Sequence, residues 1–563
     1  MSKKPLMSLL FLMAILTFSS CSSKLQPMLS ENVKVEPQPL EVVGGQVPVT
    51  INAQFPAKWF NKKAVLTITP VLRYEGGEAW GVSYTYQGEK VAGNDQVVPF
   101  DRGANVVMRT SYNYKPVMKK SELYLIFDVK LNGKEFELPD IKIGEGIIST
   151  AALADAATAT PAIAPDKFQR IIKEAYDANI MFLIQQTELR SNELNKREIA
   201  DWKNLVQNAN ETQNQNVSIE ISAYASPDGG LDLNTGLAEK REANTSRYLE
   251  RELKTKKIDV AIDSRYTAQD WDGFQELVSK SNIQDKDLVL RVLSMYKDPQ
   301  QREREIKNIS TVFSSLADEV LPQLRRSRLT ANIEIIGKSD SEIIGLAKNN
   351  PRALNVEELL YAATLTNDNA EKESLYKKAT ELYPTDYRTW NNLGLSRFNA
   401  GDLDKAEELF KKANSIKNNN EASMNLGLIA LTKGDKDTAT QLFGNASGVA
   451  ELNEALGVLY LQQGDYSKAI SAFGDIKSNN AALAQIMTKN YSKAQQTLEG
   501  VVSADATTDY LKAIVAARTN NSSAVFSNLK TAVSKNPSLA IEAAKDIEFA
   551  KYATNAAFTS IIK

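Results

Sequence analysis

Histidine is absent from the sequence, and cysteine occurs once, as Cys21. The first absence excludes His-based catalytic triads, the usual proton donor and acceptor near neutral pH, and the commonest metal ligand. The second excludes disulfide frameworks, Cys-x-x-Cys redox pairs and thiolate zinc sites. We therefore expect no metal, no cofactor and no enzymatic activity. Carboxylate-only hydrolysis of envelope glycan is the remaining enzymatic alternative, but no paired acids in a recognisable site support it.

An excess of charge of one sign is also missing. The chain has 67 Lys and Arg against 69 Asp and Glu, a formal net charge of −2. No global basic field therefore predicts binding to nucleic acid. The length of 563 residues, with 43% apolar and 24% charged residues, is typical of three or four globular domains.

No apolar run is long enough to span a membrane, and the longest run lies at the N-terminus. Lys3 and Lys4 precede an apolar run of about a dozen residues, 6–18, which is too short to span a bilayer and is typical of a signal peptide. The run leads into Phe-Ser-Ser-Cys at 18–21, which resembles the lipobox of bacterial lipoproteins, with Phe18 in place of the more usual Leu. The resemblance implies cleavage before Cys21 and lipidation of that residue.

We therefore expect a signal peptide over 1–20 and a mature chain held at the outer membrane by lipid. The residues after Cys21 include no acidic cluster of the kind that marks some surface-exported lipoproteins, so we expect the periplasmic side. The alternative is a plain secretory signal with an incidental cysteine.

Residues 21–148 have the pattern of β-structure. Runs at 47–53, 64–69 and 123–129 are β-branched or aromatic, mostly alternating, and bounded by turn residues. Gly76-Gly77 and Asn132-Gly133 indicate hairpins. The spacing predicts an immunoglobulin-like β-sandwich.

An Ala/Thr/Pro-rich segment, 149–165, follows. Its composition predicts a linker with little to bury.

Helix and strand signals alternate over the next domain, 166–340. The pattern predicts helices packed on a mixed sheet. Strands are expected at 179–184, 217–223 and 329–336, and helices at 199–209, 237–253 and, as a pair, 285–323.

The last region, 345–563, is helical and repetitive, with a spacing of about 34 residues. Glycine followed by aspartate ends the first helix of successive hairpins and would supply a left-handed cap and the next N-cap. This region resembles the tetratricopeptide repeat, an all-α solenoid, which implies an extended surface for a protein partner; the alternative is a rigid spacer. The signature residues include Trp390, Leu393, Gly394, Ala406, Phe410 and Ala413, then Leu426, Gly427, Ala439 and Phe443, then Leu456, Gly457, Ala469 and Phe473.

The central region also resembles a known domain, the peptidoglycan-associating OmpA-like domain. Asn234, Leu237 and Arg241 keep the family's helix signature after the strand at 217–221, and Arg325-Arg326 resembles its double arginine. In the family, a turn Asp engages an ammonium and the helix Arg engages a carboxylate of the stem peptide.

Such a pair of opposite charges suits a zwitterion. Here Ser226 stands at the position of the family's Asp, and Asp228 lies two residues later. The resemblance therefore implies a peptidoglycan site formed by Ser226, Asp228, Asn234, Arg241, Arg325 and Arg326. The alternative is a retained fold with a lost ligand.

These patterns together predict a non-enzymatic, lipid-anchored periplasmic scaffold. Its repeats would recruit a protein partner, and its central domain would tether the scaffold to peptidoglycan. This layout suits an accessory subunit of an outer-membrane assembly, secretion or transport complex. The first alternative is a pure adaptor that never touches peptidoglycan.

Overall fold

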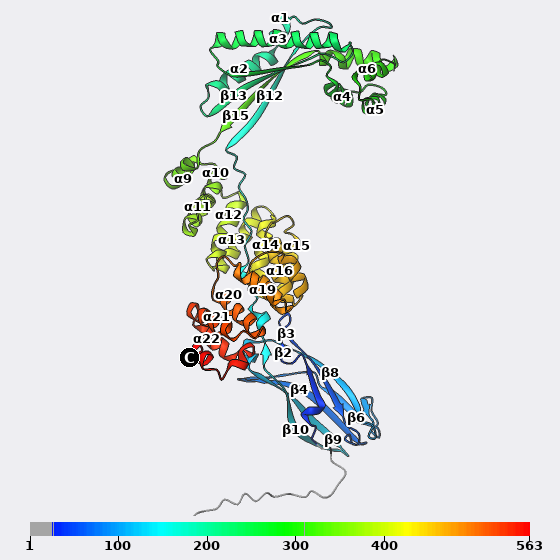
Figure 1. The fold of residues 1–563 in the computed structure, drawn as a ribbon, viewed down its shortest axis with the longest axis vertical. Coiled ribbons are helices and arrows are strands. Elements are labelled where there is room, and N and C mark those ends of the chain that lie inside the picture. Colours follow the sequence, from blue (N-terminus) through cyan, green and yellow to red (C-terminus); the bar gives the residue numbers. More distant parts are fainter. Residues whose placement is uncertain (1–24, 26, 309) are drawn as a thin grey trace, which may run out of the picture. The chain divides into compact units, whose positions relative to one another are not determined.

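The computed structural model describes residue 25, residues 27–308 and residues 310–563 (Figure 1). The expected signal peptide and the lipidation site Cys21 lie outside these residues. The described chain divides into two units: residues up to 165 together with 368–563, and residues 166–367. None of the described helices combines the length and the apolarity that a membrane span requires.

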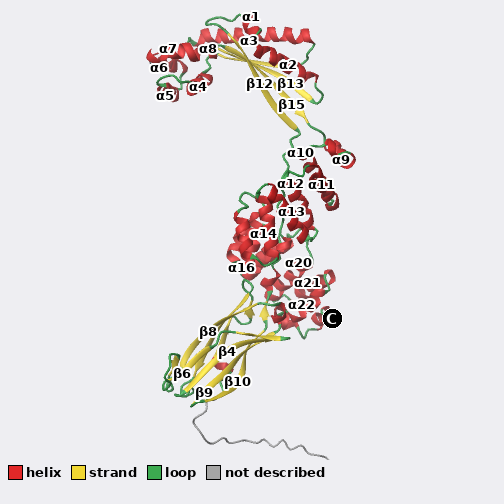
Figure 2. Cartoon of the chain, turned by 180° about the vertical axis from the view of Figure 1, so that it is seen from behind, coloured by secondary structure: helices red, strands yellow, loops and turns green. Residues whose placement is uncertain are grey.

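The N-terminal part of the first unit is β-rich with mixed sheets (Figure 2). One sheet has the order β1-β3-β8, and another has the order β10-β9-β4-β6-β7, with β5 beside β4. Burial alternates along β3 and β9, so each turns one apolar face to a shared core. The strands are β1 Val33–Glu36, β2 Leu40–Glu41, β3 Gln46–Phe55, β4 Ala64–Tyr74, β5 Gly77–Trp80, β6 Tyr84–Gly88, β7 Gln96–Val98, β8 Ala104–Asn113, β9 Ser121–Leu131, β10 Lys134–Glu145 and β11 Ile147–Ile148.

Both expected hairpins are present. Asn132 and Gly133 take positive φ angles of 50° and 79° in the two-residue connection between β9 and β10. This is the conformation that Asn-Gly favours in tight hairpins. Gly76, with φ 82°, lies in the connection between β4 and β5.

The second unit contains a four-stranded sheet of order β12-β15-β13-β14, in which β13 and β14 are parallel and the other neighbours antiparallel. Buried side chains of α2 and α3 pack against this sheet, and α4–α8 enclose a smaller core of their own. The elements are β12 Ile171–Met181, α1 Ser191–Leu194, α2 Arg197–Glu211, β13 Gln215–Tyr224, α3 Leu231–Lys256, β14 Ala261–Thr267, α4 Trp271–Lys280, α5 Lys286–Met295, α6 Pro299–Asn308, α7 Ser310–Ser315, α8 Leu321–Leu324, β15 Arg326–Ile336, α9 Asp340–Asn349 and α10 Val356–Ala362.

Two strands of this sheet differ from the sequence-based expectation. The strand expected at 179–184 runs instead over β12 and ends at Met181. The first seven residues of β12 are exposed, apolar and polar alike, so they carry no alternation that a sequence could reveal. The same holds for β14, which was not expected.

The C-terminal part of the first unit is a series of antiparallel helical hairpins (Figure 1). The first helices of the hairpins end at Gly401, Gly434 and Gly464, all with φ near +80°, and the following Asp caps the next helix as expected. The helices are α11 Asn369–Leu382, α12 Tyr387–Asn399, α13 Leu403–Ile416, α14 Asn420–Thr432, α15 Lys436–Gly444, α16 Leu452–Gln463, α17 Tyr466–Phe473, α18 Asn479–Met487, α19 Tyr491–Glu499, α20 Ala506–Arg518, α21 Ser522–Lys535, α22 Ser538–Lys545 and α23 Ala556–Ile561.

The expected signature residues form the packing of these hairpins. Gly394, Gly427 and Gly457 lie against the rings of Phe410, Phe443 and Phe473, where an added Cβ would come within 2.4–2.7 Å of a ring carbon. Glycine is therefore required where the two helices of each hairpin approach.

The segment 149–165 is not the linker that its composition predicts. Ala156, Ala159, Ala162 and Ala164 are at most 3% exposed, and the first three belong to the core of the helical region. The prediction that this segment has little to bury is wrong, because the helical hairpins supply the surface that covers its small side chains.

Candidate peptide-binding groove

The most specific polar arrangement in the first unit lies between the helical hairpins and residues 155–165. Asn392, Asn425 and Asn480 come from the first helices of three hairpins, α12, α14 and α18. Each lies nine residues before the left-handed residue that ends its helix, so the three occupy equivalent positions. All three are at most 2% exposed.

Each of these asparagines binds both backbone groups of one residue of the segment. Asn425 accepts from the Ala162 N–H at 2.6 Å and donates to the Ala162 carbonyl at 2.8 Å. Asn392 does the same to Ala164, with both distances 2.9 Å. This pairing binds the backbone N–H and carbonyl of one residue and requires no particular side chain.

The third asparagine repeats the arrangement at the other end of the segment. Asn480 accepts from the Asp155 N–H at 3.0 Å and donates to the Asp155 carbonyl at 2.8 Å. On the intervening helix α16, Ala455 occupies the equivalent position, and the neighbouring Glu454 accepts instead from the Thr160 N–H at 3.3 Å. The segment therefore runs antiparallel to the order of the repeats.

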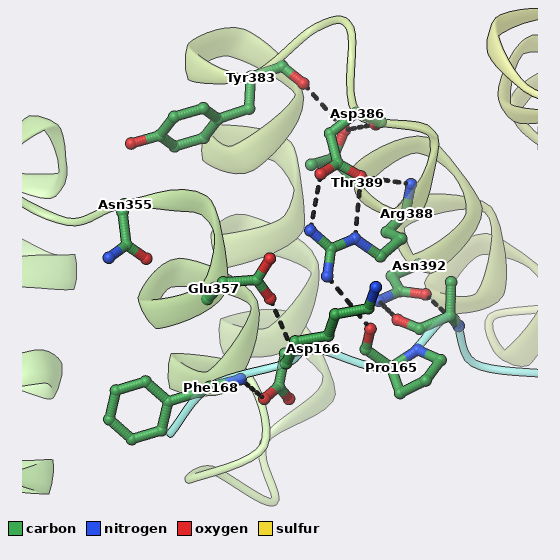
Figure 3. Close-up of polar contacts among 12 residues, drawn as sticks. Pro165, Asp166, Phe168, Asn355, Glu357, Tyr383, Asp386, Arg388, Thr389 and Asn392 are labelled. Carbon is green, nitrogen blue, oxygen red and sulfur yellow. Dashed lines mark hydrogen bonds and ion pairs between the residues drawn. The ribbon is translucent and has the colours of Figure 1, made fainter. Parts of the chain in front are cut away.

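The side of the groove near α12 holds the end of the segment (Figure 3). Arg388 pairs with Asp386 through two hydrogen bonds of 3.0 and 2.7 Å, and its Nη1 donates to the Pro165 carbonyl at 3.4 Å. Asn391 adds a second donor to the Ala162 carbonyl at 3.0 Å. The backbone groups of the buried Ala162 and Ala164 are thus paired with side chains of the groove, as burial demands.

The asparagine row was not anticipated from the sequence. The signal was present: Asn disfavours helix interiors, yet it recurs at one offset from the end of three helices. Two of the three helices end at a recognisable glycine, Gly401 or Gly434. The third ends at Lys489, with φ 62°, and a lysine gives no signal of a left-handed turn in the sequence.

The expected peptidoglycan-site residues lie together at one end of the sheet of the second unit, near the end of β13. Arg325 lies 3.3 Å from Asp228 and donates to Ser226 at 3.2 Å, and the Ser226 hydroxyl in turn donates to Asp228. Asn234 donates to the carbonyls of Ser226 and Gly229, so it holds the turn.

Arg241 is buried beneath this turn. It is 1% exposed and donates to the carbonyls of Gln186, Tyr224 and Leu183 at 3.0, 2.9 and 3.3 Å. Burial lowers the pKa of its guanidinium to about 10, and the neighbouring charge of Arg325 acts in the same direction. In this structure Arg241 therefore supports the turn from inside.

Arg326 is likewise engaged within the chain. It forms a 2.9 Å ion pair with Asp270, and both side chains are less than 10% exposed. Its guanidinium also stacks over Tyr224 at 4.6 Å. Of the predicted set, Asp228 and Arg325 retain the most exposed charges, with side-chain exposures of 19% and 11%.

No metal centre is evident in the part of the chain that the structure describes, where no group of three His, Cys, Asp or Glu side chains is placed to hold an ion.

Comparison with known proteins supports the repeats. A family model described as "Tetratricopeptide repeat" matches residues 375–408. The C-terminal region therefore contains tetratricopeptide repeats. No relative was found among curated protein sequences.

Solved structures of helical-repeat proteins are also similar to this chain. One is the APC/C hetero-tetramer Cut9-Hcn1, with 16% identity, a TM-score of 0.31, and coverage of 40% of this chain and 45% of that one. The chain thus spans under half the length of that protein. Another is a tetratricopeptide repeat protein from Parabacteroides merdae, with 14% identity, a TM-score of 0.29, and coverage of 40% and 91%. A third is YrrB, described as having an unusual peptide-binding site, with 17% identity, a TM-score of 0.21, and coverage of 37% and 100%.

Proposed function

We propose that this protein is a non-enzymatic scaffold that binds a protein partner through its tetratricopeptide array. The observation that carries the proposal is the asparagine row, in which each asparagine pairs with both backbone groups of one residue of the segment 155–164. An array with this row is built to hold polypeptide.

The proposal includes a location. Lipid on Cys21 would hold the N-terminus at the outer membrane, on the periplasmic side, as the lipobox-like sequence and the residues after it imply. An accessory role in an outer-membrane assembly, secretion or transport complex follows from combining a lipid anchor with a partner-binding array.

We also propose an immunoglobulin-like fold for the β-rich region and an OmpA-like fold for the central domain. Two sheets sharing one core support the first. The second is supported by the mixed sheet with α2 and α3 on it, and by the meeting of Ser226, Asp228 and Arg325 at its end.

Peptidoglycan binding by this central domain requires an exchange of partners. A ligand ammonium would have to replace Arg325 beside Asp228, and the released Arg325 is then the guanidinium available to a ligand carboxylate. Arg241 would keep its three carbonyl partners. Without this exchange the protein is a pure adaptor.

Recruitment of a partner is tested by crosslinking intact cells that express the tagged full chain and purifying it from their membranes. We expect a second protein to be recovered in stoichiometric amount, and less of it with Cys21→Ala, which would also leave the membrane fraction. Recovery of the chain alone after crosslinking would overturn the scaffold proposal.

Peptidoglycan binding is tested by sedimenting the full chain with purified sacculi. Asp228→Asn, which removes the only carboxylate of the turn, should abolish co-sedimentation, whereas Asp232→Asn on the first turn of α3 should not. If the wild-type protein stays in solution, peptidoglycan binding is excluded and the pure adaptor is the function that remains. Release of soluble glycan fragments would instead reveal a hydrolase.

A further inference from the structure

The groove of the array is occupied by the chain itself. Residues 155–164 lie along the first helices of the hairpins. Ala156–Thr158 form a short 3-10 turn, and beyond it Ala162 and Ala164 are fully buried, with the exposed Ile163 between them. Figure 3 shows the α12 end of this strand, where Asn392 and Arg388 meet it.

The contacts define a ligand class. Because the asparagine amides bind backbone groups, the groove selects an extended conformation. The side chains that accompany the bound backbone groups of Ala162 and Ala164 are fully buried, so only small ones fit there. An alanine-rich, extended strand meets both requirements.

An outside strand cannot share these contacts. Asn392, Asn425 and Asn480 each use both ends of their amide on the resident segment. Beside the segment there remains a pocket lined by Ala157, Thr160, Ile163, Phe398, Leu403 and Glu451, which offers none of these amides.

Covalent connection favours the resident strand further. A segment of the same chain competes at an effective concentration in the millimolar range. Its N-terminal side is also held, because Thr150 donates to Glu548, a buried carboxylate paired with Arg518.

We propose that the array's groove is a binding site for alanine-rich segments that are extended where Asn392 and Asn425 bind them. Residues 155–164 are its resident ligand, which closes the groove to any other segment while it is bound. This inference rests on the proposed protein-binding role of the array. It adds that the groove is occupied by a segment of the same chain. A strand of another protein enters only after residues 155–164 leave.

The resident strand is tested first by hydrogen exchange of the intact chain, followed by mass spectrometry of peptides that cover 155–165. We expect protected amides in the wild type. Asn425→Ala removes the acceptor of the Ala162 N–H and one of the two donors to its carbonyl, and should speed exchange of this segment roughly tenfold or more. The matched control is Asn453→Ala, an exposed asparagine on the neighbouring helix α16. Unprotected amides in the wild type would overturn the proposal.

The ligand class is tested with a labelled synthetic peptide of residues 153–166 and a full-length variant in which Gly/Ser residues replace 155–164. Fluorescence anisotropy should show saturable binding to this variant, binding at least about tenfold weaker to the wild type, and loss of binding when Asn425→Ala is added. Equal binding to wild type and variant would overturn the closed groove.

Failure of the folded variant to bind the peptide would overturn the ligand class. Should the variant fail to fold, the exchange experiment on point variants decides alone. Partner recovery from membranes is an independent readout. Absence of a partner both from the wild type and from the Gly/Ser variant would overturn the scaffold proposal, whereas the exchange experiment decides whether residues 155–164 occupy the groove.

Discussion

At the scale of single residues, a polar side chain can bind a ligand or can hold the backbone of its own chain, and the sequence does not distinguish these two roles. Arg241 matches a ligand-binding position by spacing, yet its guanidinium is buried and bound to three backbone carbonyls. Asn425 has no place in the repeat signature, yet it binds the strand in the groove. In both cases the role depends on which backbone groups the fold leaves unpaired nearby.

Arg241→Ala should destabilise the central domain. The change leaves the carbonyls of Gln186, Tyr224 and Leu183 without their donor in a buried place, which costs about 2–5 kcal/mol in the free energy of unfolding. Calorimetry of the full chain measures this as a lower melting transition for that domain.

The control for this change is Arg251→Ala, which removes an exposed arginine from the same helix, α3, and should shift the transition little. An Arg241→Ala protein as stable as the control would contradict the supporting role and return Arg241 to the list of ligand contacts.

At the scale of elements, local signals predict the hairpins of the array well because their packing is repetitive. Gly427 lies where α14 meets α15, and its neighbour Phe443 fills the space that a side chain would take. The left-handed turns are predictable from Gly401, Gly434 and Gly464, because glycine adopts a positive φ without steric cost. The segment 149–165 has no such pattern, because it forms two short 3-10 turns and an irregular stretch that is bound by side chains.

Gly427→Ala should destabilise the array. The added Cβ would lie 2.4 Å from the Phe443 ring, so the ring or the helix must move, at a cost of about 1–3 kcal/mol in the free energy of unfolding. Thermal unfolding followed by circular dichroism at the helical band measures the change.

Gly444→Ala, at the end of α15, meets nothing within 4 Å and is the matched control. It should leave stability unchanged or raise it slightly, since alanine favours helix. Equal effects of the two substitutions would contradict the close approach at Gly427.

At the scale of the whole molecule, the central domain is an insertion within the first unit. Its first strand and last strand pair with each other, Ile171 opposite Ile336, and the Gly337 N–H donates to the Arg170 carbonyl at 2.7 Å. Both connections therefore leave the sheet at one place. The buried side chains on the sheet and within α4–α8 all come from the central domain.

Replacement of 171–336 by a short Gly/Ser connection should therefore leave the first unit folded. The ends to be joined are cross-strand neighbours, so the loop closes at little entropic cost. Calorimetry should show loss of the central domain's transition and retention of the others. Loss of all cooperative unfolding would contradict separate cores.

The sequence by itself determined the helical repeats, the β-rich region and both of its tight hairpins, because these depend on short-range periodicity and on glycine or asparagine at particular turns. The resemblance to the OmpA-like domain, carried by the local spacing of Asn234, Leu237 and Arg241, also pointed to the residues around Asp228. Only the tertiary structure decided that Arg241 is buried, and that the Ala/Thr/Pro-rich segment is bound along the helical hairpins. Both depend on surfaces from distant parts of the chain: helices more than 200 residues away supply the asparagine amides for Ala162 and Ala164.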